Sequence, residues 1–232
     1  AREIERTAVF QDFSVIAGNQ FVRLGAHVDP ILVLFTPLAW TGVLPQALLV
    51  AQAVIVAAGA LPAYWLGRRW LGDERLAVAA AAVYLLYPPL QWATLTEFHP
   101  VTLAAPLLLF CIWAAEERRY VLLSVAAVLA ALTKEEVGLA LAVLGVWMIV
   151  RGRGRRYGAA LAAAALAWVA VAVLVIIPRF NEGRGSAFVD RYASLGDDGA
   201  GVTRTLLTRP WEAAELLASY DRLSYLVALL AP

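Results

Sequence analysis

The sequence predicts an all-α protein whose helices form a polytopic transmembrane bundle. Three observations lead to this prediction: 62% of the 232 residues are hydrophobic, only 16% are charged, and the mean hydropathy is +0.71. A soluble domain has about 45–50% apolar residues and about 25% charged residues. The chain is therefore expected to lie in a lipid bilayer, as a bundle with short and broken helices.

The only cysteine, the only lysine and the net charge limit the kinds of site that the chain can carry. Cys111 is the only cysteine and lies in an apolar run, so an intrachain disulfide is impossible and a catalytic thiol is not expected. Lys134 is the only lysine among 19 basic residues, and it stands inside an apolar stretch. Because every other basic position uses arginine, this lysine suggests a function. The net charge of +1 gives no sign of a nucleic-acid partner, and none is expected.

The chain is interpreted as a single membrane domain, and as a fragment of a longer polytopic protein. Residues 1–30 are expected to form an outer interfacial segment, because they mix apolar and charged side chains without a run that could span. They show no signal peptide. Residues 31–178 hold the membrane helices, and residues 179–221 form a mixed-charge outer segment. Residues 222–232 begin a further membrane helix that stops abruptly.

Four apolar runs are expected to cross the bilayer. Residues 46–66 are long enough to span a hydrocarbon core of about 30 Å. Residues 76–93 return, with a break at two adjacent prolines, and residues 101–115 and 159–178 follow. Arginines in short loops mark the cytoplasmic side of a membrane protein. The arginines at one end of these runs are Arg68, Arg69, Arg75, Arg118, Arg119, Arg151, Arg153, Arg155 and Arg156.

Residues 31–44 allow two interpretations, a segment that dips into the outer face or a short span. A helix over this stretch would be about 21 Å long, which is less than the hydrocarbon core. Pro37 interrupts it. Length therefore favours the dip, and only the dip places His27 and Asp29 on the same side of the membrane as Glu97.

Residues 121–150 contain two apolar runs separated by Thr133, Lys134, Glu135 and Glu136. One helix through the whole stretch would be about 45 Å long and would place the lysine near its middle. Arginines flank both ends, so both ends are expected on the cytoplasmic side. The stretch is predicted to form a hairpin of two short helices whose polar tip reaches the outer interface.

The outer segment carries two local signals. Its glycine-rich stretch at residues 196–201 predicts a turn region. A short helix is expected over residues 210–220. The five arginines of the segment are matched by acids, so the segment need not be cytoplasmic.

With this topology, polar side chains gather on the outer face of an apolar chain. Each of the two histidines stands two residues from a carboxylate and near a proline. The tip of the hairpin approaches from the same side. Such groups can bind one ligand or one divalent cation, and a carboxylate can act as a general base. The candidate catalytic residues are Asp29 and Glu97, and the candidate substrate-binding residues are His27, His99, Lys134, Glu135 and Glu136.

Structural roles stay open for the same residues. The two histidine–carboxylate pairs can serve as helix caps or turn formers. Lys134 can extend toward the interface from a helix end, or it can pair with a neighbouring glutamate inside the bundle. The candidate ligands of a divalent metal, Mg²⁺ or Mn²⁺, are Asp29, Glu97 and His99, and no other cofactor is expected.

Several strings of the sequence together resemble one family. The runs HVDPILVLFTPLAW, LLVAQAVIVAAGALPAYWL, VYLLYPPLQWATLTEFHPVTLAAPLLLF and ALTKEEVGLALAVLGVW are similar to those of the bacterial and archaeal predicted membrane proteins grouped as domain of unknown function 2079. The similarity extends over nearly the whole chain, including IIPRFNEGRG and RYASLG. The family is similar in layout to the GT-C membrane glycosyltransferases.

The GT-C resemblance implies transfer of a sugar from a polyprenyl-phosphate carrier on the non-cytoplasmic face of the cell membrane. Asp29 or Glu97 would deprotonate an acceptor hydroxyl in an inverting transfer, and Lys134 resembles the lysine that faces the lipid phosphate. The implied partners are the polyprenyl-phosphate-linked sugar and the lipid bilayer. A transporter or ion-coupled carrier with a polar site at broken helices, and a non-catalytic membrane scaffold, are the alternatives.

Overall fold

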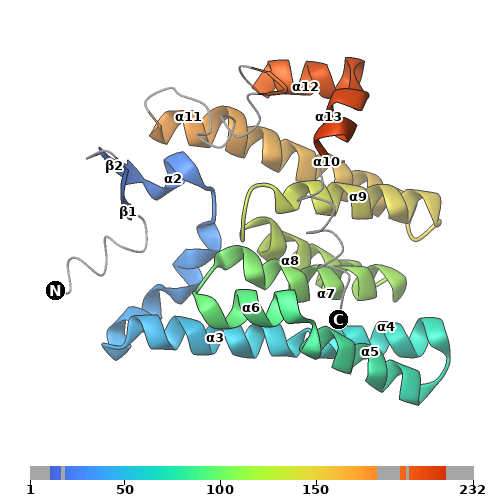
Figure 1. The fold of residues 1–232 in the computed structure, drawn as a ribbon. Helices are drawn as coiled ribbons and strands as arrows, with labels where there is room; N and C mark the ends of the chain where they lie inside the picture. Colours follow the sequence, from blue (N-terminus) through green and yellow to red (C-terminus); the bar gives the residue numbers. More distant parts are fainter. Residues whose placement is uncertain (1–10, 17–18, 182–193, 197–198, 218–232) are drawn as a thin grey trace.

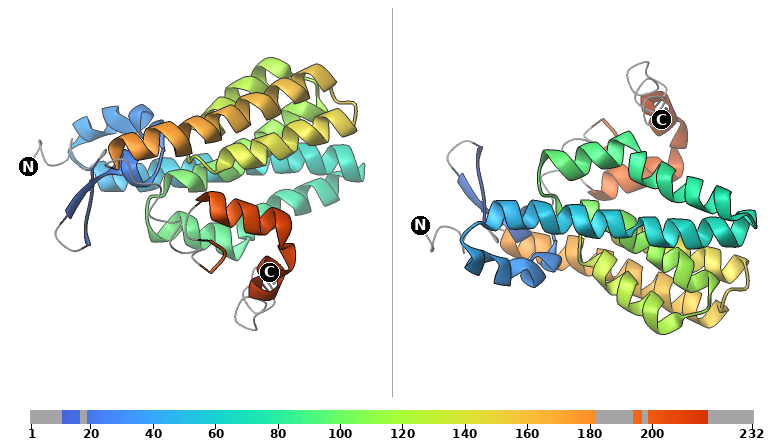
Figure 2. Two further views of the ribbon diagram at one scale, coloured as in Figure 1. Left: turned by 90° about the horizontal axis from the view of Figure 1, so that it is seen from above. Right: turned by 90° about the horizontal axis from the view of Figure 1, so that it is seen from below.

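The computed structural model describes residues 11–16, 19–181, 194–196 and 199–217, and within them the chain is a bundle of helices that lie side by side (Figures 1 and 2). This arrangement confirms the all-α fold class that the composition predicts. A short strand pair near the start of the chain is the only β-structure in the described residues.

Two continuous helices are long and apolar enough to cross a membrane. The first consists of α3 (Leu44–Ala58) and α4 (Ala60–Leu71), which join at Gly59. The second begins with α10 (Arg155–Val171) and continues through a π-helical turn, η3, into α11 (Ile177–Phe180). Both contain the runs that the sequence predicts to span.

A third span is broken where the proline pair stands. Helix α5 (Glu74–Leu86) is followed by α6 (Pro88–Thr96), and the two axes meet at 44°. Asp73 caps α5 by accepting the backbone N–H groups of Arg75 and Leu76. Tyr87 adopts an extended backbone because the residue before a proline is disfavoured in helix. The predicted break is confirmed.

The hairpin around Lys134 is also confirmed. After η2 (Pro100–Leu103) and α7 (Ala104–Glu116), helix α8 (Tyr120–Ala131) runs one way and α9 (Val137–Val150) returns. The beginning of α8 meets the region after α9, because the ring of Tyr120 stacks on that of Tyr157 at 3.9 Å between centroids. With 12 residues, α8 is about 18 Å long, so it reaches only part of the way through a bilayer.

Small residues let the hairpin pack closely against its neighbour. A side chain at Gly145 of α9 would collide with the backbone of Gly158 in α10, and one at Gly138 would collide with Val169. Glycine at such crossings lets two helices in a membrane approach closely. The core beneath includes Leu123, Leu141 and Met148, all buried.

The segment that could dip or span is a twelve-residue 3₁₀ helix, η1 (Pro30–Thr41). The amide of Ile31 at its start donates to the carbonyl of Leu132 at the hairpin tip, and Phe35 makes an edge contact with Phe98. Gly42 and Leu44 then lead directly into α3. Both ends of η1 therefore lie at the same end of the bundle, as the dipping interpretation requires (Figure 1).

The N-terminal region differs from the interfacial or loop segment that the sequence suggests. Strands β1 (Gln11–Ile16) and β2 (Asn19–Val22) pair in an antiparallel hairpin, followed by the single helical turn α2 (Arg23–Ala26). Both strands contain β-branched or aromatic residues, which favour a strand. The strands are only six and four residues long, which is too short for a clear alternation of apolar and polar residues in the sequence. Residues 1–10 lie outside the described part.

The segment after α11 contains α12 (Gly199–Thr208) and α13 (Pro210–Leu217). The expected helix near residue 210 is present. The expected turn region is shorter than predicted, because α12 already begins at Gly199. The predicted further membrane helix at residues 222–232 lies outside the described residues.

The bundle has two chemically different ends. We call the end with the loops 72–73, 117–119 and 151–154 the arginine end, and the end with His27, Glu97 and the hairpin tip the opposite end. All seven candidate site residues lie at the opposite end.

Candidate functional site

Asp29 is held by an arginine at the opposite end of the bundle. Arg23 in α2 donates from Nε to both carboxylate oxygens, at 2.8 and 3.1 Å, and from Nη2 at 2.6 Å. Asp29 is only 5% exposed and its side chain makes no cap for η1, so the capping role is wrong. A buried carboxylate in a bidentate ion pair is a poor general base, because it must leave its partner to accept a proton.

Nothing in the described residues binds Nη1 of Arg23. Its guanidinium has five N–H donors, and Asp29 uses those of Nε and Nη2. The carboxylate therefore fixes the plane of the guanidinium and leaves one nitrogen for another acceptor. The N–H groups of that nitrogen can donate charge-assisted hydrogen bonds to a phosphate.

Glu135 fastens the N-terminal region to the hairpin tip. Its Oε2 accepts the backbone N–H of Val28 at 2.9 Å, and its Oε1 lies 3.4 Å from Nδ1 of His27. Burial raises the pKa of this carboxyl, but the hydrogen bonds from His27 and Val28 more than offset it, so the pKa lies below its usual value. The carboxylate is therefore ionised and structural at neutral pH.

Lys134 lies at the surface of the same tip. Its Nζ is 2.9 Å from Oε1 of Glu136, and the two side chains are 23% and 59% exposed. The structure therefore has the expected pairing of this lysine with a neighbouring glutamate. The pair lies at the surface of the bundle and not inside it. The lysine can therefore exchange its partner for an incoming anion without stranding a buried carboxylate.

Gln52 organises the turn that carries Glu97 and His99. This fully buried amide of α3 donates from Nε2 to the carbonyls of Thr94 and Glu97, at 2.9 and 3.0 Å, and its Oε1 accepts the amide of His99 at 2.9 Å. The side chains of Glu97 and His99 remain exposed, 3.5 Å apart. The backbone of the turn is thus fixed while both functional groups face outward.

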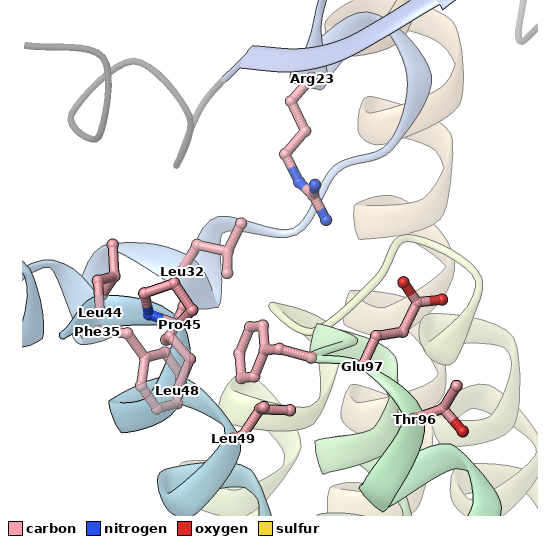
Figure 3. Close-up of a pocket in the computed structure, with 10 residues that line it drawn as sticks. Arg23, Leu32, Phe35, Leu44, Pro45, Leu48, Leu49, Thr96 and Glu97 are labelled. Atoms are coloured by element: carbon pink, nitrogen blue, oxygen red, sulfur yellow. The ribbon is translucent and has the colours of Figure 1, made fainter. Parts of the chain in front are cut away.

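A cavity of about 440 Å³ lies between η1, the start of α3 and the end of α6. Its wall is mostly apolar, and Arg23 and Glu97 are the two charged residues that line it (Figure 3). In Figure 3 the guanidinium of Arg23 lies at the top and the carboxylate of Glu97 at the right, whereas the leucines and Pro45 lie to the left and below. The lining residues are Arg23, Leu32, Phe35, Leu44, Pro45, Leu48, Leu49, Thr96, Glu97 and Phe98.

Four of the candidate residues thus differ in their surroundings. His27, Asp29 and Glu135 belong to a network that holds the N-terminal region, whereas Glu97 opens onto the cavity. In the described part of the chain, no three histidine, cysteine or carboxylate side chains are placed to hold a metal ion. Asp29 therefore does not join Glu97 and His99 in one ligand set.

Two residues of this site, Arg23 and Gln52, are not among the candidates that the sequence indicates. Arg23 is one of the charged residues of the expected interfacial segment, and only its spacing of six residues from Asp29 could link the two in sequence. Gln52 is an amide within a mostly apolar span, whose other glutamine, Gln46, lies near its start. A polar residue within a membrane helix is a functional or structural candidate by default, and that signal was available.

Comparison with known proteins gives one match. A family model described as a predicted membrane protein, DUF2079, matches residues 7–232 of the chain. No curated protein and no solved structure matches it.

Proposed function

The chain belongs to the DUF2079 family of predicted membrane proteins, and we propose that it is an integral membrane glycosyltransferase of the GT-C type. The donor is a sugar linked to a polyprenyl phosphate. The single observation that carries this proposal is the apolar cavity that ends at Glu97 and Arg23. A long isoprenoid chain needs apolar walls, its phosphate needs a cation, and the acceptor hydroxyl needs a base.

Glu97 is the proposed general base. It lines the cavity, and its side chain is 68% exposed. Nε2 of the nearby His99 lies 3.5 Å from its carboxylate, so the carboxylate remains accessible to an acceptor hydroxyl. The Glu97 carboxylate takes the proton of the acceptor hydroxyl, whose oxygen forms a bond to the anomeric carbon from the side opposite the phosphate. The bond between that carbon and the phosphate oxygen breaks, so the configuration inverts.

Arg23 and Lys134 are the proposed phosphate ligands. The departing phosphate carries away the electron pair of the broken bond, so cations that face it favour the transition state. Nη1 of Arg23 has no partner among the described residues, and Asp29 orients the guanidinium, which makes Asp29 a positioning residue. Lys134 reaches the same end from the hairpin tip. Mg²⁺ or Mn²⁺ fits here only as an ion that arrives with the phosphate, because Glu97 and His99 supply just two ligands.

We place this site on the non-cytoplasmic face of a multi-pass protein in the cell membrane. The support is the segregation of charge, because the short loops at the arginine end carry the arginine clusters and those at the opposite end do not. Transport is the second candidate. It is less well supported, since Gln52 is the buried polar side chain inside the first span and its hydrogen bonds are already used.

The test is transfer of radiolabelled sugar from total polyprenyl-phosphate lipids by the protein in membranes. Glu97→Gln keeps the size of the side chain and removes its basicity, so transfer should fall by at least about a hundredfold. Glu215→Gln, an exposed change on α13, should leave transfer unchanged. Equal activity of wild type and Glu97→Gln would refute the assignment of the base.

A further inference from the structure

A second cavity, of about 830 Å³, lies at the arginine end and opens between α4, α7 and α9. It is separate from the proposed transfer site, since the two share no lining residue. Helices α7 and α9 both run toward the arginine end, and each presents apolar residues followed by a charged residue. The residues that line it are Arg69, Trp70, Leu108, Ile112, Glu116, Ala140, Val143, Leu144, Trp147 and Arg151.

The apolar part of this cavity has the shape of a groove along two helices. Leu108 and Ile112 are one helical turn apart on α7, and Val143 and Trp147 are one turn apart on α9. Val143 is 69% exposed in the described residues, so the α9 side of the groove opens outward. From Leu108 to the end of α7 the groove extends about 12 Å along the axis. These dimensions and this chemistry suit a hydrocarbon chain.

The charged end of the cavity carries a positive charge that the described residues do not neutralise. Glu116 is buried, and its Oε2 accepts a hydrogen bond of 2.8 Å from Arg69 and forms an ion pair with Nη2 of Arg153 at 2.8 Å. Arg69 also binds Glu117 at 2.7 Å. These four residues cancel one another, whereas Arg151, at the end of α9, has no carboxylate partner among the described residues.

The surroundings reinforce this positive charge. Residues 68–75, 117–119 and 151–156 carry only Asp73, Glu74 and Glu117 as acids against an excess of arginines. Trp70 and Trp147 line the cavity beside Arg69 and Arg151. Tryptophan is enriched at the depth of lipid headgroups, where its ring faces chains and its N–H faces water. Arginine and tryptophan therefore place the headgroup level at this end of the groove.

We propose that this cavity binds an anionic phospholipid, with the headgroup phosphate at Arg151 and one acyl chain in the groove between α7 and α9. Basic cavities between membrane helices on the cytoplasmic side are suited to anionic headgroups. A zwitterionic lipid would bring a quaternary amine toward an already positive surface. Because Glu116 is paired with two arginines, it does not repel the phosphate. The lipid would tie α4, α7 and α9 together at the arginine end.

The test is native mass spectrometry of the protein released from detergent micelles that contain either phosphatidylglycerol or phosphatidylcholine with identical acyl chains. The wild type should retain phosphatidylglycerol preferentially. Arg151→Gln should lower that retention about fivefold, the effect of one arginine near an anionic lipid surface. Arg155→Gln removes the same charge from the same loop without touching the cavity, so it should leave retention nearly unchanged.

A variant that fills the groove and a competitor without an acyl chain test the two parts of the site separately. Val143→Trp fills the groove at an exposed position without changing charge, and it should also reduce retention. Glycerol 1-phosphate, which has the headgroup charge but no chain, should not displace the lipid. Equal retention of both lipids, equal losses in the two arginine variants, full retention in Val143→Trp, or displacement by glycerol 1-phosphate would each overturn the proposal.

Discussion

Glu135 accepts the backbone N–H of Val28 at 2.9 Å, although the two residues are 107 positions apart in the sequence. This hydrogen bond joins the tip of the α8–α9 hairpin to the segment that leads into η1. A second hydrogen bond joins the same two segments, because the amide of Ile31 donates to the carbonyl of Leu132 at 3.0 Å. The hairpin tip therefore supports the segment that carries Arg23 and Asp29. Within the tip, Glu135 holds this segment in place, whereas Lys134 and Glu136 pair with each other at the surface.

Glu135→Ala is expected to destabilise the protein. The substitution removes a charged acceptor and leaves the buried N–H of Val28 unpaired, which costs about 2–3 kcal/mol in free energy of unfolding. The apparent melting temperature in detergent should fall clearly. Glu136→Ala is the matched control, because Glu136 is the adjacent residue and its side chain is 59% exposed. Equal melting temperatures for the two variants would show that Glu135 does not hold the tip.

Gln52→Leu is expected to lower stability and to loosen the turn at Glu97. Leucine has a similar size but leaves the amide of His99 and the carbonyl of Thr94 without the partners they have now. Unpaired buried groups cost about 1–3 kcal/mol each. Gln91→Leu is the control, since Gln91 is exposed and bonds only the carbonyl of Leu85. A Gln52→Leu protein as stable as Gln91→Leu would contradict this role.

Lys134→Ala is expected to leave the melting temperature nearly unchanged, because its partner Glu136 is exposed and a surface ion pair contributes about 0–1 kcal/mol. Sugar transfer should nevertheless be lost. Lys134→Arg should retain part of the activity, since it keeps the charge but changes a compact ammonium into a planar fork. A Lys134→Ala protein that is stable and fully active would remove Lys134 from the proposed phosphate site.

Cysteine labelling in a Cys111→Ala background tests which face of the membrane carries the site. Glu97→Cys should react with an impermeant thiol reagent in intact cells, and Arg155→Cys only after permeabilisation, because arginine-rich loops stay in the cytoplasm. Position 29 is a poor probe, since Asp29 is buried against Arg23. The reverse labelling pattern would place the site on the cytoplasmic face.

The hairpin and the broken span were predictable because their signals are local. Charges at Lys134 cannot stay in the middle of a bilayer, and the proline at position 88 cannot continue a helix, so neighbouring residues alone decide both features. The arginine clusters further set which ends of the helices lie together.

The partners of the polar residues were not predictable in the same way. Gln52 meets the turn at Glu97 from 45 positions away, and Glu116 meets Arg69 from 47 positions away. Such pairs depend on how helices pack, and helix packing follows from small residues such as Gly145 and Gly158, which carry no polar signal. The sequence could therefore identify Glu97 as a candidate without indicating that Arg23, and not Asp29, faces the same cavity.

The most direct measurement is an experimental structure of the protein in a lipid nanodisc that contains polyprenyl phosphate. We expect the isoprenoid chain in the cavity lined by Phe35, Leu48 and Leu49, and the phosphate within hydrogen-bonding distance of Nη1 of Arg23, with Lys134 turned toward it from Glu136. A cavity without the lipid, or a phosphate bound far from Arg23 and Glu97, would contradict the proposed transfer site.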